Sequence, residues 1–77
     1  MDIDKIVTDF VADFKLRYKG RRALKTAYHF FNWASCFDAV RCKQKMAEFD
    51  AYCRRRKVRA TWRNAAEWYA TGKVVVK

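Results

Sequence analysis

The chain has 77 residues and a formal net charge of +10, so it is near the lower size limit at which one hydrophobic core can hold a fold without disulfides or metals. We therefore expect a single domain over residues 1–77, too small to enclose a deep active site. Because 52% of the residues are hydrophobic and 17% aromatic, the composition excludes a disordered tail.

Glycine and proline are placed as they would be in a helical protein. The chain has no proline, and its only glycines, Gly20 and Gly72, lie where helical patterns of apolar residues stop. Glycine is common just beyond helix C-termini, whereas proline interrupts helices. We therefore predict an all-α fold, a compact bundle of three or four helices with the segment KVVVK as a short extended C-terminal tail.

The first predicted helix begins after Asp2, a good N-cap residue, and ends at Gly20. Acidic residues fill its first half and basic residues its last turns, as the helix dipole favours. Its apolar face comprises Ile3, Ile6, Val7, Phe10, Val11 and Phe14. This face either packs on the other helices or, through Phe10 and Phe14, binds a second copy of the chain in a homodimer or a larger protein partner.

The middle of the chain predicts two further helices. A second apolar stripe indicates a helix over about residues 22–33 and comprises Leu24, Ala27, Tyr28 and Phe31. Ser35 then stands three residues before Asp38, a capping-box arrangement that predicts a new helix over about residues 36–55. The alternative is one long helix through this point. The apolar stripe of the third helix comprises Ala39, Cys42, Met46, Phe49 and Cys53.

Thr61 is the expected cap of a last helix, over residues 62–71, that ends at Gly72. Its apolar face comprises Trp62, Ala65, Ala66 and Tyr69. Small residues on that face leave room for close packing, so Trp62 and Tyr69 are expected in the core. Three polar side chains then point outward, namely Arg63, Asn64 and Glu67.

No pattern of catalytic or metal-binding residues is evident. Three cysteines are spaced too widely for a zinc motif, and Cys42 and Cys53 would lie roughly 16 Å apart along a helix, too far for a disulfide. We expect reduced, part-buried thiols, a part-buried His29, no metal, no cofactor and no enzymatic activity. Acidic first residues and short apolar runs argue against a signal peptide or a membrane span, so a cytoplasmic protein is expected.

Positive charge is concentrated in residues 41–63, which carry nine basic side chains against two acidic ones. The dipole at a helix C-terminus accounts for two or three cations among Arg54, Arg55 and Arg56. It does not account for the continuation of charge over Lys57, Arg59 and Arg63. Such clustering is typical of proteins that bind a polyanion, and we predict phosphate contacts from these six residues.

Aromatic residues near this charge suggest a single-stranded nucleic acid, because bases stack on exposed aromatic side chains. Trp68, toward the edge of the apolar face, and Trp33, at a helix end, are candidates for stacking on a base or on a protein partner. Trp62, although expected in the core, is a further candidate for stacking on a base. A helix-turn-helix that reads duplex DNA with Arg63 and Asn64 is a second interpretation, and RNA a third.

The segment EFDAYCRRRKVRATWRNAAEW, residues 48–68, resembles the C-terminal signature of phage and prophage replication proteins of the helicase-loader type. The matching residues are Phe49, Tyr52, Lys57, Ala60, Thr61, Trp62, Arg63 and Asn64. Val58 and Ala65 stand where that pattern has tryptophans. The resemblance implies binding of single-stranded DNA and assembly of primosomes, through Lys57, Arg59, Trp62 and Arg63.

Taken together, these features favour a small basic accessory protein of a phage or mobile element that binds single-stranded DNA. The alternative is a protein-binding module that inhibits or recruits a host enzyme acting on nucleic acid. That alternative would use the first helix and Trp33. An acidic mimic of nucleic acid is disfavoured by the charge of +10.

Overall fold

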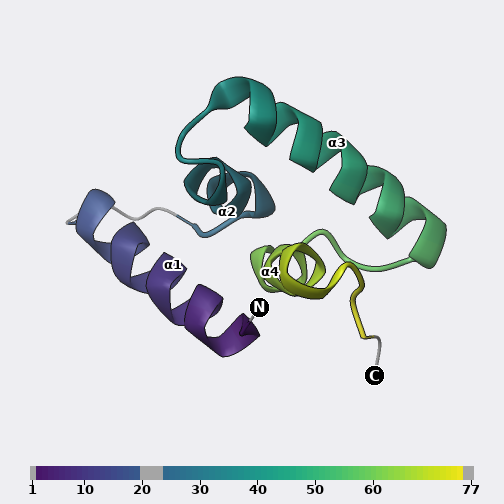
Figure 1. Cartoon of the computed structure of the whole chain (residues 1–77), viewed down its shortest axis with the longest axis horizontal. Coiled ribbons are helices and arrows are strands. Elements are labelled where there is room, and N and C mark those ends of the chain that lie inside the picture. The colour runs from purple at the N-terminus through teal and green to yellow at the C-terminus, as the bar shows by residue number, and fades with distance from the viewer. Residues whose placement is uncertain (1, 20–23, 76–77) are drawn as a thin grey trace.

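The computed structural model describes residues 2–19 and 24–75 and forms four helices within those ranges, with no strand. They are α1 (Ile3–Arg17), α2 (Ala27–Ala34), α3 (Ala39–Arg56) and α4 (Trp62–Thr71). The short helices α2 and α4 pack on each other in the centre, with α1 against α4 and α3 against α2 on opposite sides (Figure 1). The predicted all-α bundle is confirmed.

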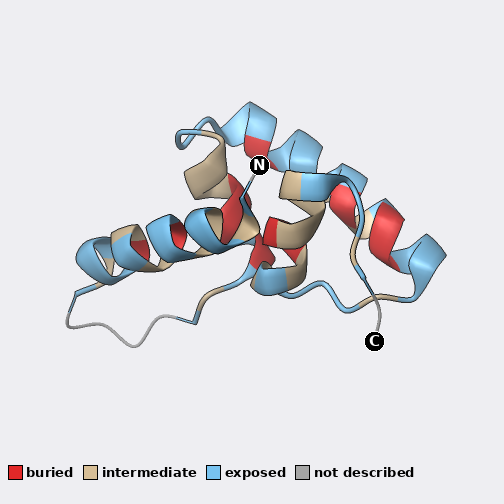
Figure 2. Ribbon diagram, turned by 60° about the horizontal axis from the view of Figure 1, so that its bottom comes forward, coloured by how far each residue is buried: buried red, intermediate tan, exposed pale blue. Residues whose placement is uncertain are grey.

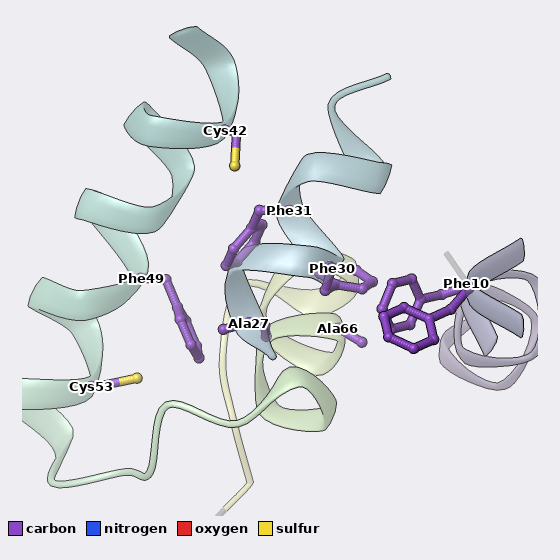
Figure 3. Packing of buried hydrophobic residues seen from close by; sticks show 10 residues of the cluster. Phe10, Ala27, Phe30, Phe31, Cys42, Phe49, Cys53 and Ala66 are labelled. Carbon is purple, nitrogen blue, oxygen red and sulfur yellow. The ribbon is translucent and has the colours of Figure 1, made fainter. Parts of the chain in front are cut away.

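The core is built mainly from phenylalanines that join neighbouring helices (Figure 3). Phe10 of α1 lies 5.4 Å from Phe30 of α2, and Phe31 of α2 lies 5.5 Å from Phe49 of α3, measured between ring centroids. Pairs at this spacing contribute about 0.5–1.5 kcal/mol each beyond the burial of their area. Ala65 and Ala66 of α4 are fully buried. Their small side chains allow α4 to approach the phenylalanines closely.

The second helix differs from its prediction. It begins at Ala27, because the Thr26 hydroxyl accepts a hydrogen bond from the His29 amide and caps the helix there. Leu24, expected on the apolar face, precedes the helix and is 83% exposed, and Tyr28 is exposed too. Phe30 is fully buried instead. The predicted start at residue 22 lies outside the described residues.

The break between the second and third helices is confirmed, but its predicted geometry is wrong. Ser35 is the C-cap of α2 rather than the N-cap of α3. Cys36 and Phe37 adopt left-handed backbone conformations, with φ of 53° and 62°, and they turn the chain. Asp38 caps α3 by accepting hydrogen bonds from the amides of Val40 and Arg41. Either residue type can cap a helix. Only Asp38 follows the left-handed pair that redirects the chain.

Helix α1 is capped by Asp2 as predicted, and its apolar face packs inside the molecule. Phe10 is 1% and Phe14 is 7% exposed. The prediction that these two side chains bind a partner is therefore wrong for the folded chain, because they fill its own core. Figure 2 shows the buried positions of α1 facing the other helices and its exposed positions facing outward. The predicted end at Gly20 is too late: α1 ends at Arg17, and its C-cap is Tyr18, whose backbone amide donates to the Phe14 carbonyl. Gly20 itself lies outside the described residues.

The bounds of the last helix and the non-helical form of residues 73–75 follow their predictions. Thr61 caps α4 and Gly72, in a left-handed conformation, ends it. Lys73 forms hydrogen bonds with the Thr71 side chain within the turn, and two further hydrogen bonds join Val74 and Val75 to the helices. The Val74 amide donates to the Tyr52 hydroxyl at 2.8 Å, and the Val75 amide donates to a Glu67 carboxylate oxygen at 3.0 Å. The tail is thereby fixed against α3 and α4.

The capping arrangement at the α2–α3 turn can be tested by two substitutions. Asp38→Ala removes the acceptor for two helix-start amides, so we expect the free energy of unfolding to fall by about 1 kcal/mol. Ser35→Ala removes no cap of α3 and should change it by less than about 0.5 kcal/mol. Urea unfolding followed by circular dichroism measures both values. A larger loss for Ser35→Ala would contradict the assignment.

Candidate nucleic-acid interface

The six basic residues predicted to contact phosphate are all exposed. Arg54, Arg55 and Arg56 end α3, Lys57 is its C-cap, Arg59 lies in the connection to α4, and Arg63 is in the first turn of α4. The four ion pairs found among the described residues involve other basic side chains. Within the described part of the chain, the positive charge of these six residues is therefore not compensated by a close carboxylate.

These six residues do not form one surface. Successive positions on an α-helix are about 100° apart around its axis. Arg55 shares a flank of α3 with Tyr52, three residues earlier, and both line the same groove. Arg54 is turned toward the other flank of α3, which carries Asp50 four residues earlier. The run of three arginines is therefore divided between two sides of the helix.

We call the first hollow the α3–α4 groove; it has a volume of about 530 Å³ and is lined by Lys45, Glu48, Ala51, Tyr52, Arg55 and Trp68. Trp68 joins the two helices, since its ring lies 5.5 Å from Phe49 of α3 and 6.3 Å from Tyr52. The Lys45 ammonium lies 5.9 Å from the Trp68 ring centroid. The groove thus combines aromatic rings with a cation at each end.

Two further hollows continue from this groove around the tail. One is lined by Tyr52, Arg56, Lys73 and Val74. The next is lined by Lys57, Val58, Arg59, Thr61, Asn64, Val74 and Val75. Neighbouring hollows share the lining residue Tyr52 or Val74, so the three hollows lie next to one another. We call the basic residues along them the basic track, which comprises Lys45, Arg55, Arg56, Lys57, Arg59 and Lys73.

Asn64 holds the turn that precedes α4 rather than pointing outward. Its side-chain amide donates a 2.8 Å hydrogen bond to the Arg59 carbonyl, and its backbone amide donates to the Thr61 hydroxyl. Glu67, also expected outward, is half-buried and bound to the tail. The outward placement of Asn64 and Glu67 is therefore wrong. Their polar groups satisfy backbone partners instead.

Helix α4 is surrounded by the rest of the protein. Of its ten residues, only Arg63 and Thr71 are exposed. A recognition helix in a major groove presents several neighbouring side chains to base edges. Because α4 offers one exposed basic residue and no exposed base-reading amide, the geometry does not favour the duplex-reading helix-turn-helix.

The three tryptophans lie in different surroundings. Trp62 and Trp33 are half-buried on the α1 side, with ring centroids 5.4 Å and 5.5 Å from that of Phe10. The Arg63 guanidinium lies 4.7 Å from the Trp62 centroid. Trp68 is half-buried on the α3 side and lines the α3–α4 groove together with Lys45 and Arg55. Of the predicted stacking residues, the structure therefore brings only Trp68 onto the basic track.

Sequence reasoning assigned no site role to three residues that line the α3–α4 groove or the two hollows next to it, namely Lys45, Tyr52 and Lys73, whereas Arg55 was predicted. Lys45, Tyr52 and Arg55 are spaced at i, i+7 and i+10, which places them on one helix flank, so the grouping of Lys45 and Tyr52 with Arg55 was detectable from periodicity. Lys73 had no such signal. Its position depends on the tail, which is held by the hydrogen bond from the Val74 amide to the Tyr52 hydroxyl, 22 residues away in sequence.

The three cysteines and His29 differ in their burial. Burial raises the pKa of the Cys42 thiol, and burial together with the nearby Asp50 carboxylate raises the pKa of the Cys53 thiol. Cys36 is exposed, contrary to the expectation of three part-buried thiols. His29 is half-buried, with Nδ1 3.0 Å from the Thr26 hydroxyl. Among the described residues no group of three or more potential ligands is placed to hold a metal ion.

Comparison of the chain with protein-family models, with curated proteins and with solved structures finds no match. None of the helices in the described ranges is both long and apolar enough to cross a membrane.

The left-handed backbone at Lys57 gives a stability prediction. A non-glycine residue with φ of 56° carries a steric penalty that glycine avoids. We expect Lys57→Gly to raise the free energy of unfolding by about 1 kcal/mol in urea titrations. Lys57→Ala, which removes the same charge but keeps the side-chain carbon, serves as the control and should give no such gain. Equal effects of the two variants would contradict a backbone origin.

Proposed function

We propose that this protein is a small accessory protein, encoded by a phage or mobile element, that binds single-stranded DNA along the basic track. The observation that carries the proposal is the α3–α4 groove, in which Trp68 and Tyr52 lie between Lys45 and Arg55. Proteins that hold single strands combine a positive groove with aromatic rings on which bases stack.

The exposed charges support phosphate binding. Five of the six basic-track residues lie at the end of α3, in the following turn or in the tail, and have no close carboxylate among the described residues. Lys45 alone is paired, at 3.5 Å with exposed Glu48, and such surface pairs contribute little. A phosphate of a polyanion can therefore replace Glu48 as the partner of Lys45 with little loss of free energy.

The resemblance to phage replication proteins agrees with this proposal and shifts its stacking residue. Ala65 stands where the pattern has a tryptophan, and Ala65 is fully buried against the core. A larger ring would not fit there without rearrangement. Trp68, one turn later on the edge next to α3, is the residue that we assign to stacking on this chain.

A salt titration tests the proposal. Six phosphate contacts on a single strand predict that the logarithm of affinity falls with the logarithm of salt concentration at a slope of about −4, from roughly −0.7 per contact. Arg55→Gln should weaken binding and reduce the magnitude of that slope by about 0.7. Fluorescence anisotropy of a labelled oligonucleotide gives both quantities.

Arg54→Gln is the matched control, because it removes the same charge one residue away on the other flank of α3. Its slope should stay near that of the unmodified protein, and circular dichroism should show equal helicity for both variants. Absence of binding at low salt would refute the proposal. Equal slopes for the two variants would place the site elsewhere.

A second candidate function, recruitment or inhibition of a host nucleic-acid enzyme, is favoured by a separate groove. This groove has a volume of about 520 Å³ and is lined by Asp2, Lys5, Ile6, Asp9, Trp33, Ala34, Cys36 and Tyr69. It lies on the α1 side, where the aspartates disfavour a polyanion. Exposed aromatic and aliphatic surface of this kind is common at the centre of protein interfaces.

Blocking that groove separates the two functions. Ala34→Gln places a longer, uncharged side chain at the end of α2, where Ala34 lines the groove. If the groove binds a protein, a partner that the unmodified chain retains from a nuclease-treated bacterial lysate should be lost. Affinity for single-stranded DNA should remain within about twofold, since no charge changes. Retention of the partner by the variant would exclude this groove as its binding site.

A further inference from the structure

The α3–α4 groove contains one acidic residue, Glu48, among its lining side chains. A carboxylate in a phosphate-binding groove opposes binding unless it faces a part of the ligand other than phosphate. Its exposed ion pair with Lys45, at 3.5 Å, contributes little to stability. The position of Glu48 is therefore informative about what the groove holds.

Charges alternate along this flank of α3. From Lys45 to Glu48 the helix rises about 4.5 Å, and from Glu48 to Arg55 about 10.5 Å. Phosphates are attracted to the two cationic ends and repelled from the middle. A strand that lies along the groove therefore presents a base or sugar to Glu48.

The middle of the groove has room for such a base. Ala51, one turn after Glu48, contributes only a methyl group to the lining, and Trp68 supplies an aromatic ring opposite α3. The Lys45 ammonium lies 5.9 Å from the centroid of that ring and can move to a phosphate. A base that takes the place of the Lys45 ammonium over the Trp68 ring would lie in the hollow that Glu48 also lines.

We propose that this groove selects a base that carries an exocyclic amino group, with Glu48 as the acceptor. The inference rests on the proposed binding of single-stranded DNA. An ionised carboxylate only accepts hydrogen bonds. Cytosine N4 and adenine N6 are donors, whereas the corresponding position of thymine, O4, is an acceptor that the carboxylate repels. Glu48 is thus assigned as a specificity-determining residue.

Cytosine and thymine are compared because both are pyrimidines with rings of the same size. They differ at position 4, at N3, which carries a hydrogen only in thymine, and in the C5 methyl group of thymine, so the Glu48→Gln variant is needed to isolate the effect of the carboxylate. We expect the unmodified protein to bind an oligo(dC) of about a dozen nucleotides roughly fivefold more tightly than the equivalent oligo(dT), by fluorescence anisotropy at low salt. In Glu48→Gln the amide can donate as well as accept, so the ratio should fall to about one, mainly through tighter binding of oligo(dT).

Asp50→Asn is the matched control, since it removes an acidic charge two residues away on the other flank of α3. It should raise affinity for both oligonucleotides equally and keep their ratio. Equal binding of the two by the unmodified protein, a preference for oligo(dT), or an unchanged ratio in Glu48→Gln would overturn the inference while leaving DNA binding intact. Failure of both oligonucleotides to bind would instead refute the proposed function, and this inference with it.

Discussion

The two adjacent phenylalanines of α2 are the contact on which the arrangement of the other helices depends. Phe30 and Phe31 are both fully buried, although they are neighbours in sequence. Phe30 contacts Phe10 of α1 and Tyr69 of α4, at 5.4 and 5.7 Å between centroids. Phe31 contacts Phe49 of α3 and Trp68 of α4. Because consecutive side chains diverge by about 100°, one short helix holds α1 on one side and α3 on the other.

The same contacts position the candidate interface. Trp68 packs edge-on against Phe31 at 5.8 Å, so its location between α3 and α4 is fixed by the core. Its remaining surface lines the α3–α4 groove. The tail is held by Tyr52, which also lines that groove. Residues on a rigid scaffold hold their geometry better than residues on free loops. The aromatic part of the groove is therefore preformed, while the long basic side chains around it adapt.

How far the sequence predicts this structure depends on the range of the interactions. The caps Asp2 and Thr61, the stop at Gly72 and most of the apolar face of α3 follow from nearby residues, and they were predicted. On α3, Ala39 was expected on that face but is exposed, and the buried Tyr52 was not expected there. The start of α2 was not predicted correctly. Leu24 is apolar and fits the helical spacing, but it lies before Thr26, which caps the helix. Ser35 and Asp38 were locally equivalent as caps. The left-handed turn at Cys36 and Phe37 makes Asp38, rather than Ser35, the N-cap of α3. That turn depends on how α3 packs against α2.

In the candidate site, too, some features could be predicted from the sequence and others could not. The concentration of charge in residues 41–63 was visible in the sequence, and so was a group of aromatic residues. Which arginine faces which flank follows from helical periodicity once α3 is placed. The role of Asn64 in holding the turn was missed although it is local, since its side chain binds the Arg59 carbonyl five residues earlier. The approach of Lys73 was not predictable, because it depends on the contact of the tail with Tyr52. The helical spacing of Phe10 and Phe14 is the same whether the two side chains bind a partner or pack in the core of the chain. The sequence therefore did not distinguish these two roles.

Within residues 2–19 and 24–75, two places adopt left-handed conformations without glycine, and they differ in what surrounds them. At Cys36 and Phe37 the strain is offset by contact: the Arg17 guanidinium lies 3.8 Å from the Phe37 ring centroid and is held by Asp13 at 2.7 Å. At Lys57 no ion pair among the described residues offsets it, and the side chain is exposed. Glycine would suit that C-cap better. Departures from local preference are expected where function requires a particular side chain. Lys57 lies on the basic track. The proposed contact of its charge with phosphate is therefore a physical reason for a lysine at a position where the backbone conformation alone favours glycine.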